Sequence, residues 1–455
     1  MNAIPLKELL DGVAETGSVS PVTAVVTDSR AVGPGSVFIA IKGQRADGHD
    51  HAAAALAAGA VAVVAEHEIP GLPRERVFAA GNVRDALIRM GGNYRARYTP
   101  VLAGITGSVG KTTTKEFCAA VFSAFGQTVK TEGNQNNEIG VPGTLFRLSE
   151  STRYAVVEMG MDNRGDLHKL TLAARPCAAV ITRIGVSHIE NLGSQDNILA
   201  AKMEICDGLP DDGLLVVNGD DARLAAVAPP RHIRKIQFGV NSRFAQVTAC
   251  DIVSGPQGES FRIRDRLHGD FAASIPAVGR HNVYNALAAY TLATRLGLDP
   301  ARAATALADY RTTGMRQKLV DHEGVQIIED CYNANPDSMR AALETLATLG
   351  ACGRKVAVLG DMLELGAISE QAHREVGRLA AQGGVDCLIT FGPGGALIAD
   401  GAAAAGLAEA HPCQTKEDAA ALLRAYCRPG DTVLFKASRG MAFEEIAALY
   451  CGRPM

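Results

Sequence analysis

The 455-residue sequence contains no tryptophan, and aromatic side chains make up only 5% of it. It also lacks an excess of either charge, because 45 basic and 49 acidic residues leave a formal charge of −4. This balance argues against nucleic-acid binding and against a polybasic membrane anchor. No apolar run is long enough to cross a bilayer, and acidic residues interrupt residues 1–15. We therefore expect no membrane span and no signal peptide.

The ten cysteines are scattered, and no two of them form a Cys-x-x-Cys pair. This spacing excludes a zinc knuckle and gives no sign of a disulfide framework. With 47% hydrophobic residues the chain can build substantial cores, and its length predicts roughly three domains at about 150 residues each. We therefore expect a soluble cytoplasmic protein, and most simply an enzyme.

Glycine is abundant, at 48 residues, and falls mostly between short β-branched runs and alanine-rich helical runs. That alternation is typical of parallel α/β sheets. It predicts an α/β protein of three domains, namely a small α/β domain over residues 1–83, a central domain over 84–312 and a doubly wound, Rossmann-like domain over 313–455. Alternating residues and turn signals over 244–275 add a few antiparallel strands to the central domain.

The individual elements are expected where apolar runs meet turn residues. In the first domain we expect strands at 24–27, 36–41 and 61–65 and a helix at 52–58. In the central domain we expect helices at 85–97, 111–125 and 282–296 and strands at 101–106, 154–158, 178–184 and 214–218. In the last domain we expect strands at 325–330, 355–359, 387–391 and 432–436 and helices at 338–349, 371–381, 416–426 and 443–450.

The most specific motif runs from Gly104 to Thr113, between an apolar strand and a helix, which is the context of a phosphate-binding loop. Its glycines let successive backbone N–H groups converge on phosphate oxygens at a helix N-terminus. Lys111 would reach the β- and γ-phosphates, and the Thr112 hydroxyl would bind Mg²⁺. Ile105 stands where the longer form of the motif has glycine. The motif predicts ATP contacts from Gly107, Ser108, Val109, Gly110, Lys111, Thr112 and Thr113.

Other polar residues follow neighbouring predicted strands of the central domain. Glu158 ends one strand, and His188 comes soon after another. Carboxyl ends of parallel strands meet at one edge of the sheet, so with Thr112 these residues form a candidate magnesium site. A switch GTPase is disfavoured, because the Asn-Lys-x-Asp guanine reader is absent and Asp162-Asn163-Arg164-Gly165 alone is a weak match.

Several longer motifs lie in order along nearly the whole chain, namely Thr131–Pro142, Glu158–Met161, Ile184–Glu190, Ala201–Ile205, Gly279–Ala286, Tyr332–Met339 and Gly360–Gly366. Together they resemble the motifs of the Mur ligases, the ATP-dependent amide-forming enzymes of peptidoglycan precursor synthesis. In the C-terminal part, Tyr-Asn-Ala-Asn-Pro at 332–336 is similar to the branch that joins D-alanyl-D-alanine to UDP-N-acetylmuramoyl-tripeptide. The Asp-Asn-Pro-Arg pattern of the preceding ligase is absent.

The resemblance implies that ATP phosphorylates the tripeptide carboxylate and that the dipeptide amine then displaces phosphate. It implies that Lys111, Glu158, His188 and Lys202 are catalytic, and that Lys202 is carbamylated and binds metal together with Thr112, Glu158 and His188. It also implies further ATP contacts from Asn137, Asn282, Arg316 and Asp330. Residues near the UDP-sugar would be Ser29, Arg30, Gly43 and Asp47. Residues near the dipeptide would be Asn333, Asn335 and Ser338, with Lys436, Ser438 and Arg439 as weaker candidates.

Two alternatives stay open. One is a sister amide ligase of the same architecture, such as another Mur ligase or a folylpolyglutamate-type synthetase. The other is a nucleotide-dependent regulatory module, which would hydrolyse ATP slowly without an amine acceptor. The sequence does not tell whether the third peptide residue is diaminopimelate or lysine. We expect a monomer whose domains close over ATP.

Overall fold

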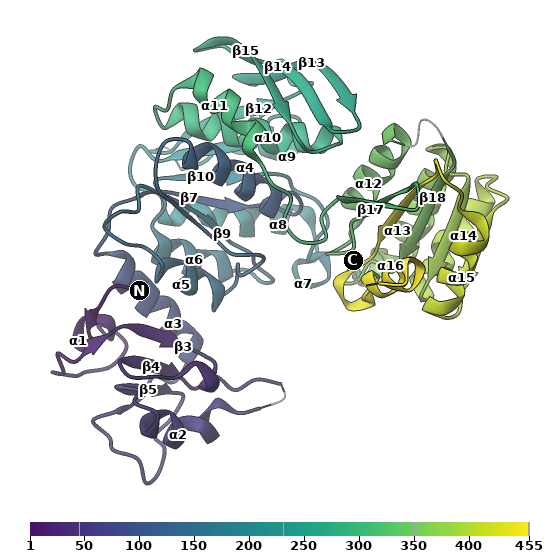
Figure 1. Ribbon diagram of the computed structural model, residues 1–455. Coiled ribbons are helices and arrows are strands. Elements are labelled where there is room, and N and C mark those ends of the chain that lie inside the picture. Colours follow the sequence, from purple (N-terminus) through teal and green to yellow (C-terminus); the bar gives the residue numbers. More distant parts are fainter. Residues whose placement is uncertain (45, 231, 350–352, 454–455) are drawn as a thin grey trace.

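The computed structural model describes residues 1–44, 46–230, 232–349 and 353–453. In the described residues, three large β-sheets, each flanked by helices, follow one another along the chain, and a two-stranded sheet lies near the N-terminus, so the predicted mixed α/β fold is confirmed. In Figure 1 the first sheet lies below the central one, and the third stands to the side, joined to the centre by a single extended segment. Within the described residues, no helix is long and apolar enough to span a bilayer.

The N-terminal part holds a parallel four-stranded sheet in the order β3-β4-β5-β6 and a small antiparallel pair, β1 with β2. Strands at 24–27, 36–41 and 61–65 and a helix at 52–58 are confirmed, with shorter ends. The strands are β1 (Ile4–Pro5), β2 (Pro21–Val22), β3 (Ala24–Val26), β4 (Ser36–Ile39), β5 (Ala62–Ala65) and β6 (Val77–Ala79). The helices are α1 (Leu6–Leu9) and α2 (Ala52–Ala57).

The central part is built on a nine-stranded sheet in the order β15-β14-β13-β12-β11-β10-β7-β9-β8. Its strands run parallel as far as β13, and β13, β14 and β15 are antiparallel, as the turn-rich stretch predicts. The strands are β7 (Val101–Thr106), β8 (Thr128–Lys130), β9 (Tyr154–Glu158), β10 (Ala178–Ile181), β11 (Leu214–Asn218), β12 (Arg234–Gly239), β13 (Val247–Gly255), β14 (Gly258–Asp265) and β15 (Gly269–Ile275). The helices are α3 (Val83–Arg95), α4 (Lys111–Ser123), α5 (Gly140–Leu145), α6 (Asp166–Ala174), α7 (Ile189–Leu192), α8 (Gln195–Met203), α9 (Ala222–Ala226), α10 (Arg280–Arg295) and α11 (Pro300–Ala306).

The C-terminal part is a six-stranded sheet in the order β16-β17-β21-β18-β19-β20, parallel except for the edge strand β16. All four predicted strands and all four predicted helices are present. The strands are β16 (Lys318–His322), β17 (Val325–Glu329), β18 (Lys355–Gly360), β19 (Cys387–Phe391), β20 (Ala410–Cys413) and β21 (Thr432–Lys436). The helices are α12 (Pro336–Leu349), α13 (Ser369–Gln382), α14 (Pro393–Ala404), α15 (Lys416–Tyr426) and α16 (Glu444–Cys451).

The prediction of four strand–helix repeats in the C-terminal part is wrong, because it misses one helix and one strand. These are α14 and β20, which lie between β19 and α15. The sequence of α14 is rich in glycine and alanine, which weakens any helical periodicity. Those small residues have a packing role, since a Cβ on Gly401 would lie 2.1 Å from the Arg374 carbonyl oxygen of α13. The same holds for Gly377, whose added Cβ would lie 1.9 Å from the Ile398 oxygen.

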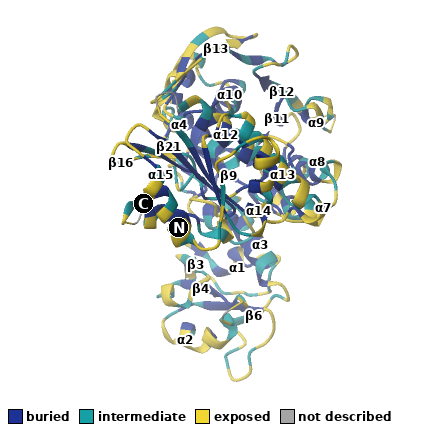
Figure 2. Ribbon diagram, turned by 90° about the vertical axis from the view of Figure 1, so that its right-hand side faces the viewer, coloured by how far each residue is buried: buried dark blue, intermediate teal, exposed yellow. Residues whose placement is uncertain are grey.

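The buried residues form continuous layers on the sheets, as the dark strands in Figure 2 show. One apolar cluster extends from Ile4 through Val64 of the first sheet and Tyr94 of α3 to Val157 and Ile181 of the central sheet. The first and central sheets are thus joined through α3, which packs on α5 and α6. Separate apolar clusters cover the two faces of the C-terminal sheet.

Candidate active site

A cavity of about 1220 Å³ lies where the carboxyl end of the central sheet faces the C-terminal part. Both parts supply its lining, which is why residues far apart in the sequence meet there. Predicted site residues that line it are Ser108, Val109, Gly110, Lys111, Thr112, Thr113, Asn137, Glu158, His188, Asn282, Arg316, Asp330, Asn333, Asn335, Ser338 and Lys436. The wall also includes polar residues that were not predicted as site residues, among them Asn136, Asp162, Arg183 and Gln317.

The phosphate-binding loop connects β7 to α4, as predicted. Gly110 caps α4 with φ +81°, a left-handed conformation, and an added Cβ would lie 2.6 Å from Asn285 Oδ1. Lys111 Nζ donates to the Gly107 carbonyl oxygen at 2.8 Å, and burial lowers its pKa. The N-terminus of a 13-residue helix and a lysine thus face the same space, which suits a polyphosphate.

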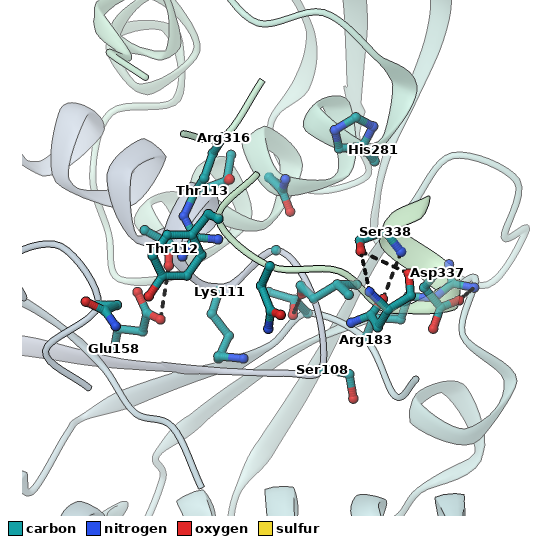
Figure 3. A pocket seen from close by; sticks show the side chains of 18 of the residues that line it. Ser108, Lys111, Thr112, Thr113, Glu158, Arg183, His281, Arg316, Asp337 and Ser338 are labelled. Carbon is teal, nitrogen blue, oxygen red and sulfur yellow. Dashed lines mark hydrogen bonds and ion pairs between the residues drawn. The ribbon is translucent and has the colours of Figure 1, made fainter. Parts of the chain in front are cut away.

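Thr112 and Glu158 meet at the floor of the cavity, where Figure 3 shows them side by side. The Thr112 hydroxyl donates to Glu158 Oε1 at 3.1 Å, and Asn136 Nδ2 donates to the same oxygen at 2.8 Å. Glu158 Oε2 is buried without a hydrogen-bond partner in the described structure. An orphaned carboxylate oxygen beside a hydroxyl is a donor set that suits a hard cation such as Mg²⁺.

His188 lines the cavity, whereas Lys202 lies outside its lining but close enough for its charge to act on His188. Burial, followed by the charges of Lys111 and Lys202, lowers the pKa of His188 to about 4, so its imidazole is neutral at neutral pH. Lys202, on α8, is 1% exposed, and burial places its pKa well below the usual value. Among the described residues, no three His, Cys, Asp or Glu side chains gather closely enough to hold a metal unaided.

The second turn of α4 carries a buried ionic cluster that was not among the predicted site residues. Lys115, fully buried, donates to the carbonyl oxygens of Thr131 and Gly133 at 2.8 and 3.0 Å. Its Nζ lies 2.9 Å from Glu116 Oε1, and Glu116 also pairs with Lys130. Thr131 in turn accepts a hydrogen bond from the Glu158 backbone N–H. The cluster therefore ties α4 to the loop beside Glu158.

Replacing Lys115 by methionine should lower the free energy of unfolding by about 3–5 kcal/mol, because it leaves the Glu116 carboxylate buried with one partner fewer. Lys130→Met should lower the free energy of unfolding by less, since the Lys130 side chain is 32% exposed and water can take its place beside Glu116. Urea unfolding curves of both variants test this. A Lys130 variant that is as unstable as the Lys115 variant would contradict it.

The C-terminal part contributes a second set of charged residues to the cavity. The Arg316 guanidinium carbon lies 3.8 Å from the centre of the Tyr332 ring, on which it stacks. Asp330 follows β17 directly, and its Oδ2 accepts from Lys436 Nζ at 2.7 Å. Lys436, only 2% exposed, also donates to the Asn333 carbonyl oxygen at 3.1 Å. This lysine therefore fixes the segment that carries both Asp330 and Asn333.

The predicted ATP contact Asn282 and the predicted dipeptide residues Asn335 and Ser338 are held by local hydrogen bonds. Asn282 Nδ2 donates to Gln317 Oε1 at 3.1 Å, so the start of α10 is bonded to the segment that leads into the C-terminal sheet. Asn335 and Ser338 bond one another at the N-terminus of α12, where the Ser338 N–H donates to Asn335 Oδ1 at 2.8 Å. Gln317 could not have been found from sequence, because it lies in a segment without a motif.

The predicted substrate residues of the N-terminal part lie away from this cavity. Arg30 pairs with Asp28 at 2.6 Å on the surface, and Asp47 accepts from the His49 backbone N–H. Gly43 donates its N–H to the Ala46 carbonyl oxygen in the same polar loop as Asp47. Ser29 begins a short 3₁₀ turn that Asp28 caps. Gly107 lies outside the cavity lining, where its carbonyl oxygen accepts from Lys111.

Three stretches of the chain match parts of one protein family. Residues 21–84 match the Mur ligase family catalytic domain, 105–293 the Mur ligase middle domain, and 315–439 the Mur ligase glutamate ligase domain. The chain is 38% identical to the UDP-N-acetylmuramoyl-tripeptide–D-alanyl-D-alanine ligase of Bacillus subtilis over 93% of this chain and 92% of that protein.

Solved structures agree with these matches. The crystal structure of MurF from Acinetobacter baumannii superposes with a TM-score of 0.90, at 29% identity and full coverage of both chains. The structure of MurF ligase from Thermotoga maritima in complex with ADP superposes with a TM-score of 0.85, at 28% identity over 95% of this chain and 97% of that one.

Proposed function

The chain belongs to the Mur ligase family, and we propose that it joins D-alanyl-D-alanine to UDP-N-acetylmuramoyl-tripeptide at the expense of ATP. The product would be the UDP-N-acetylmuramoyl-pentapeptide, released with ADP and phosphate during peptidoglycan precursor synthesis. The observation that carries the proposal is the single cavity in which the phosphate-binding loop, Glu158 and the Asn333–Ser338 turn face one another. The carboxylate, ATP and amine need such a common space.

In the first step, an oxygen of the tripeptide carboxylate attacks the γ-phosphorus of ATP. The bond from that phosphorus to the bridging oxygen breaks, and ADP leaves, so the carboxylate becomes an acyl phosphate. Negative charge moves onto the phosphate oxygens, which Lys111 and the backbone N–H groups at the start of α4 are placed to stabilise. Arg316 lines the same cavity, close enough for its charge to act on Lys111, and supplies a second fixed cation.

In the second step, the neutral amine of the dipeptide attacks the acyl carbon. The carbon–oxygen bond to phosphate breaks, inorganic phosphate leaves, and the nitrogen loses a proton as the amide forms. The acyl phosphate would hydrolyse in water, so the walls must exclude solvent while the amine approaches. The dipeptide candidates Asn333, Asn335 and Ser338 line the same cavity as the phosphate-binding loop, so a dipeptide bound there would hold its amine near the acyl group.

The residues at the cavity floor fit Mg²⁺. Thr112 and Glu158 would hold it, with phosphate oxygens and water completing the shell, as is usual for this ion. Bound there, the ion would neutralise phosphate charge. His188, kept neutral by burial, is available as a further ligand. Asn136 would orient Glu158 through its hydrogen bond.

We also propose that Lys202 is carbamylated and acts as an additional oxygen ligand. Its amine nitrogen attacks CO₂, one N–H proton is released, and an anionic carbamate results. The reaction needs a neutral amine, and the burial that lowers the pKa of Lys202 favours that form. Lys202 therefore suits modification better than an exposed lysine would.

Activity should fall on the acid side as Lys202 becomes an ammonium and its carbamate is lost. Since the pKa of Lys202 is lowered, this loss should occur at a lower pH than an ordinary lysine would give. Lys202→Ala should lose at least about 10²-fold in kcat, of the order that one electrostatic group contributes. Added bicarbonate or a small carboxylate should restore part of the lost activity of Lys202→Ala. Full activity of Lys202→Ala, or no rescue, would contradict the proposal.

An amine-acceptor assay separates the proposed ligase from the alternatives. The purified chain is given ATP, Mg²⁺ and each of two UDP-muramoyl-tripeptides, ending in diaminopimelate or lysine. ADP release is compared with D-alanyl-D-alanine, single amino acids or glutamate as acceptor. We expect release that depends on the dipeptide. Preference for one amino acid or for glutamate would indicate a sister amide ligase, and slow hydrolysis indifferent to acceptor would indicate a regulatory ATPase.

We further propose a cytoplasmic location, because ATP and UDP-linked substrates are available there, and action as a monomer, because one chain supplies both walls of the cavity. The surface residues Ser29, Arg30, Gly43 and Asp47 remain our candidates for the UDP end of the long substrate. They lie on polar loops of the N-terminal part, apart from the reacting centre.

A further inference from the structure

The loop that follows β10 contacts both the phosphate-binding loop and the C-terminal part. The Ser108 backbone N–H donates to the Arg183 carbonyl oxygen at 2.9 Å. The Ser187 hydroxyl donates to the Ser108 carbonyl oxygen at 3.2 Å. Both backbone groups of Ser108, a residue inside the phosphate-binding loop, are therefore bonded to this one loop.

The same Ser187 hydroxyl also accepts a hydrogen bond from the other wall of the cavity. Asn335 Nδ2 donates to Ser187 Oγ at 2.7 Å. The opposite end of the Asn335 amide, Oδ1, accepts from the Ser338 N–H at the start of α12. Asn335 is 7% exposed, so water competes little for these bonds. A continuous chain of hydrogen bonds therefore runs from Ser108 through Ser187 to the first turn of α12.

Gly185 explains how the two parts approach so closely. A Cβ at this position would lie 2.3 Å from Asp337 Oδ2 and 3.3 Å from the Ser108 Cβ. Arg183 and Asp337 form an ion pair at 3.2 Å beside it, which Figure 3 shows next to Ser338. The Arg183 side chain is half exposed, so its ion pair with Asp337 contributes little to the stability of this contact. The close contact and the Ser187 bonds define this junction.

We propose that Ser187 is a positioning residue that couples ATP in the phosphate-binding loop to binding of the dipeptide at the start of α12. Phosphate binding fixes the peptide units of the loop, and the Ser108 carbonyl then holds the Ser187 hydroxyl in one orientation. In that orientation the hydroxyl oxygen can accept a hydrogen bond from Asn335 Nδ2. The bonded Asn335 then holds in place the turn that carries Ser338. The proposal rests on the proposed function, and the coupling must act equally in both directions.

The test measures binding rather than turnover. Equilibrium dialysis with radiolabelled D-alanyl-D-alanine gives its Kd on the full chain with the tripeptide substrate, with and without a non-hydrolysable ATP analogue and Mg²⁺. The ratio of the two Kd values is the coupling factor. We expect at least about a 5-fold ratio for the wild type, the lower end of typical couplings. Ser187→Ala should bring it close to one and change the Kd of the analogue alone less than about 2-fold.

Two further variants separate coupling from a general structural defect. Gly185→Ala should also reduce the coupling factor, since its methyl group pushes Asp337 away. Gly143→Ala, where a Cβ meets nothing within 4 Å, and Ser151→Ala at an exposed position should keep the wild-type factor.

A wild-type factor near one, or an unchanged factor in Ser187→Ala, would overturn the coupling role. The proposed function is tested separately by pentapeptide formation with the wild type. If the wild type forms pentapeptide and Ser187→Ala keeps the full factor, only the coupling proposal is wrong. If the wild type forms none, the proposed function is wrong.

Discussion

Replacing Lys111 by methionine is expected to lower kcat/KM by at least about 10³-fold, because a fixed cation next to the transferring phosphate is lost. Methionine keeps most of the side-chain volume, so α4 and its phosphate-binding loop should remain folded. The lysine reaches the Gly107 carbonyl oxygen across the loop, which keeps it close to where the phosphates would lie. Steady-state ADP release with both peptide substrates measures the loss.

The matched control for Lys111→Met is Lys7→Met, which removes an equal charge from an exposed position in the N-terminal part. It should keep wild-type kinetics. Thermal unfolding of the Lys111 variant should stay close to that of the wild type, because burial already disfavours the ammonium there. A Lys111 variant with more than a tenth of wild-type kcat/KM would show that the loop does not stabilise the reacting phosphate.

Replacing Glu158 by glutamine is expected to reduce kcat by about 10²–10³-fold, as when one transition-state electrostatic contact is removed. The amide matches the carboxylate in shape and can still accept from Thr112 Oγ1 or Asn136 Nδ2. It cannot supply the negative charge that the orphaned Oε2 now offers. The defect should therefore appear in the metal dependence as well as in the rate.

A magnesium titration of activity measures how far the loss of the Glu158 charge weakens metal binding. Glu158→Gln should need at least about 10-fold more Mg²⁺ for half-maximal activity, and Asn136→Ala should show a smaller shift, because it only orients the carboxylate. If Glu158→Gln had the magnesium dependence of the wild type, Glu158 would not belong to the metal site, whatever its effect on rate.

Much of the fold was predictable because its buried strands are short, continuous apolar runs. The strands at 101–106, 154–158 and 432–436 begin and end where the sequence predicts. By contrast, α14 was missed because its glycines serve close packing on α13, a contact that is visible only in three dimensions. The three-residue strand β6 is too short to give a periodic signal.

Some residues of the candidate site could likewise be predicted from local sequence patterns, and others could not. Lys111, Thr112 and Glu158 could be predicted as site residues because a motif or a strand end marks them, and the structure brings Thr112 and Glu158 into contact. Asn136 and Ser187 form hydrogen bonds with residues that are distant in sequence. Their partners, Glu158 and Asn335, lie 22 and 148 residues away, so no local sequence pattern predicts these bonds.

The most direct measurement follows one oxygen atom through the reaction. The tripeptide carboxylate is labelled with ¹⁸O, and the inorganic phosphate released during pentapeptide formation is analysed by mass spectrometry. An acyl phosphate formed in this cavity requires that each phosphate carry one oxygen from the carboxylate, with ADP and pentapeptide formed in equal amounts. Phosphate free of the label would mean that water had attacked ATP and that the carboxylate was never phosphorylated.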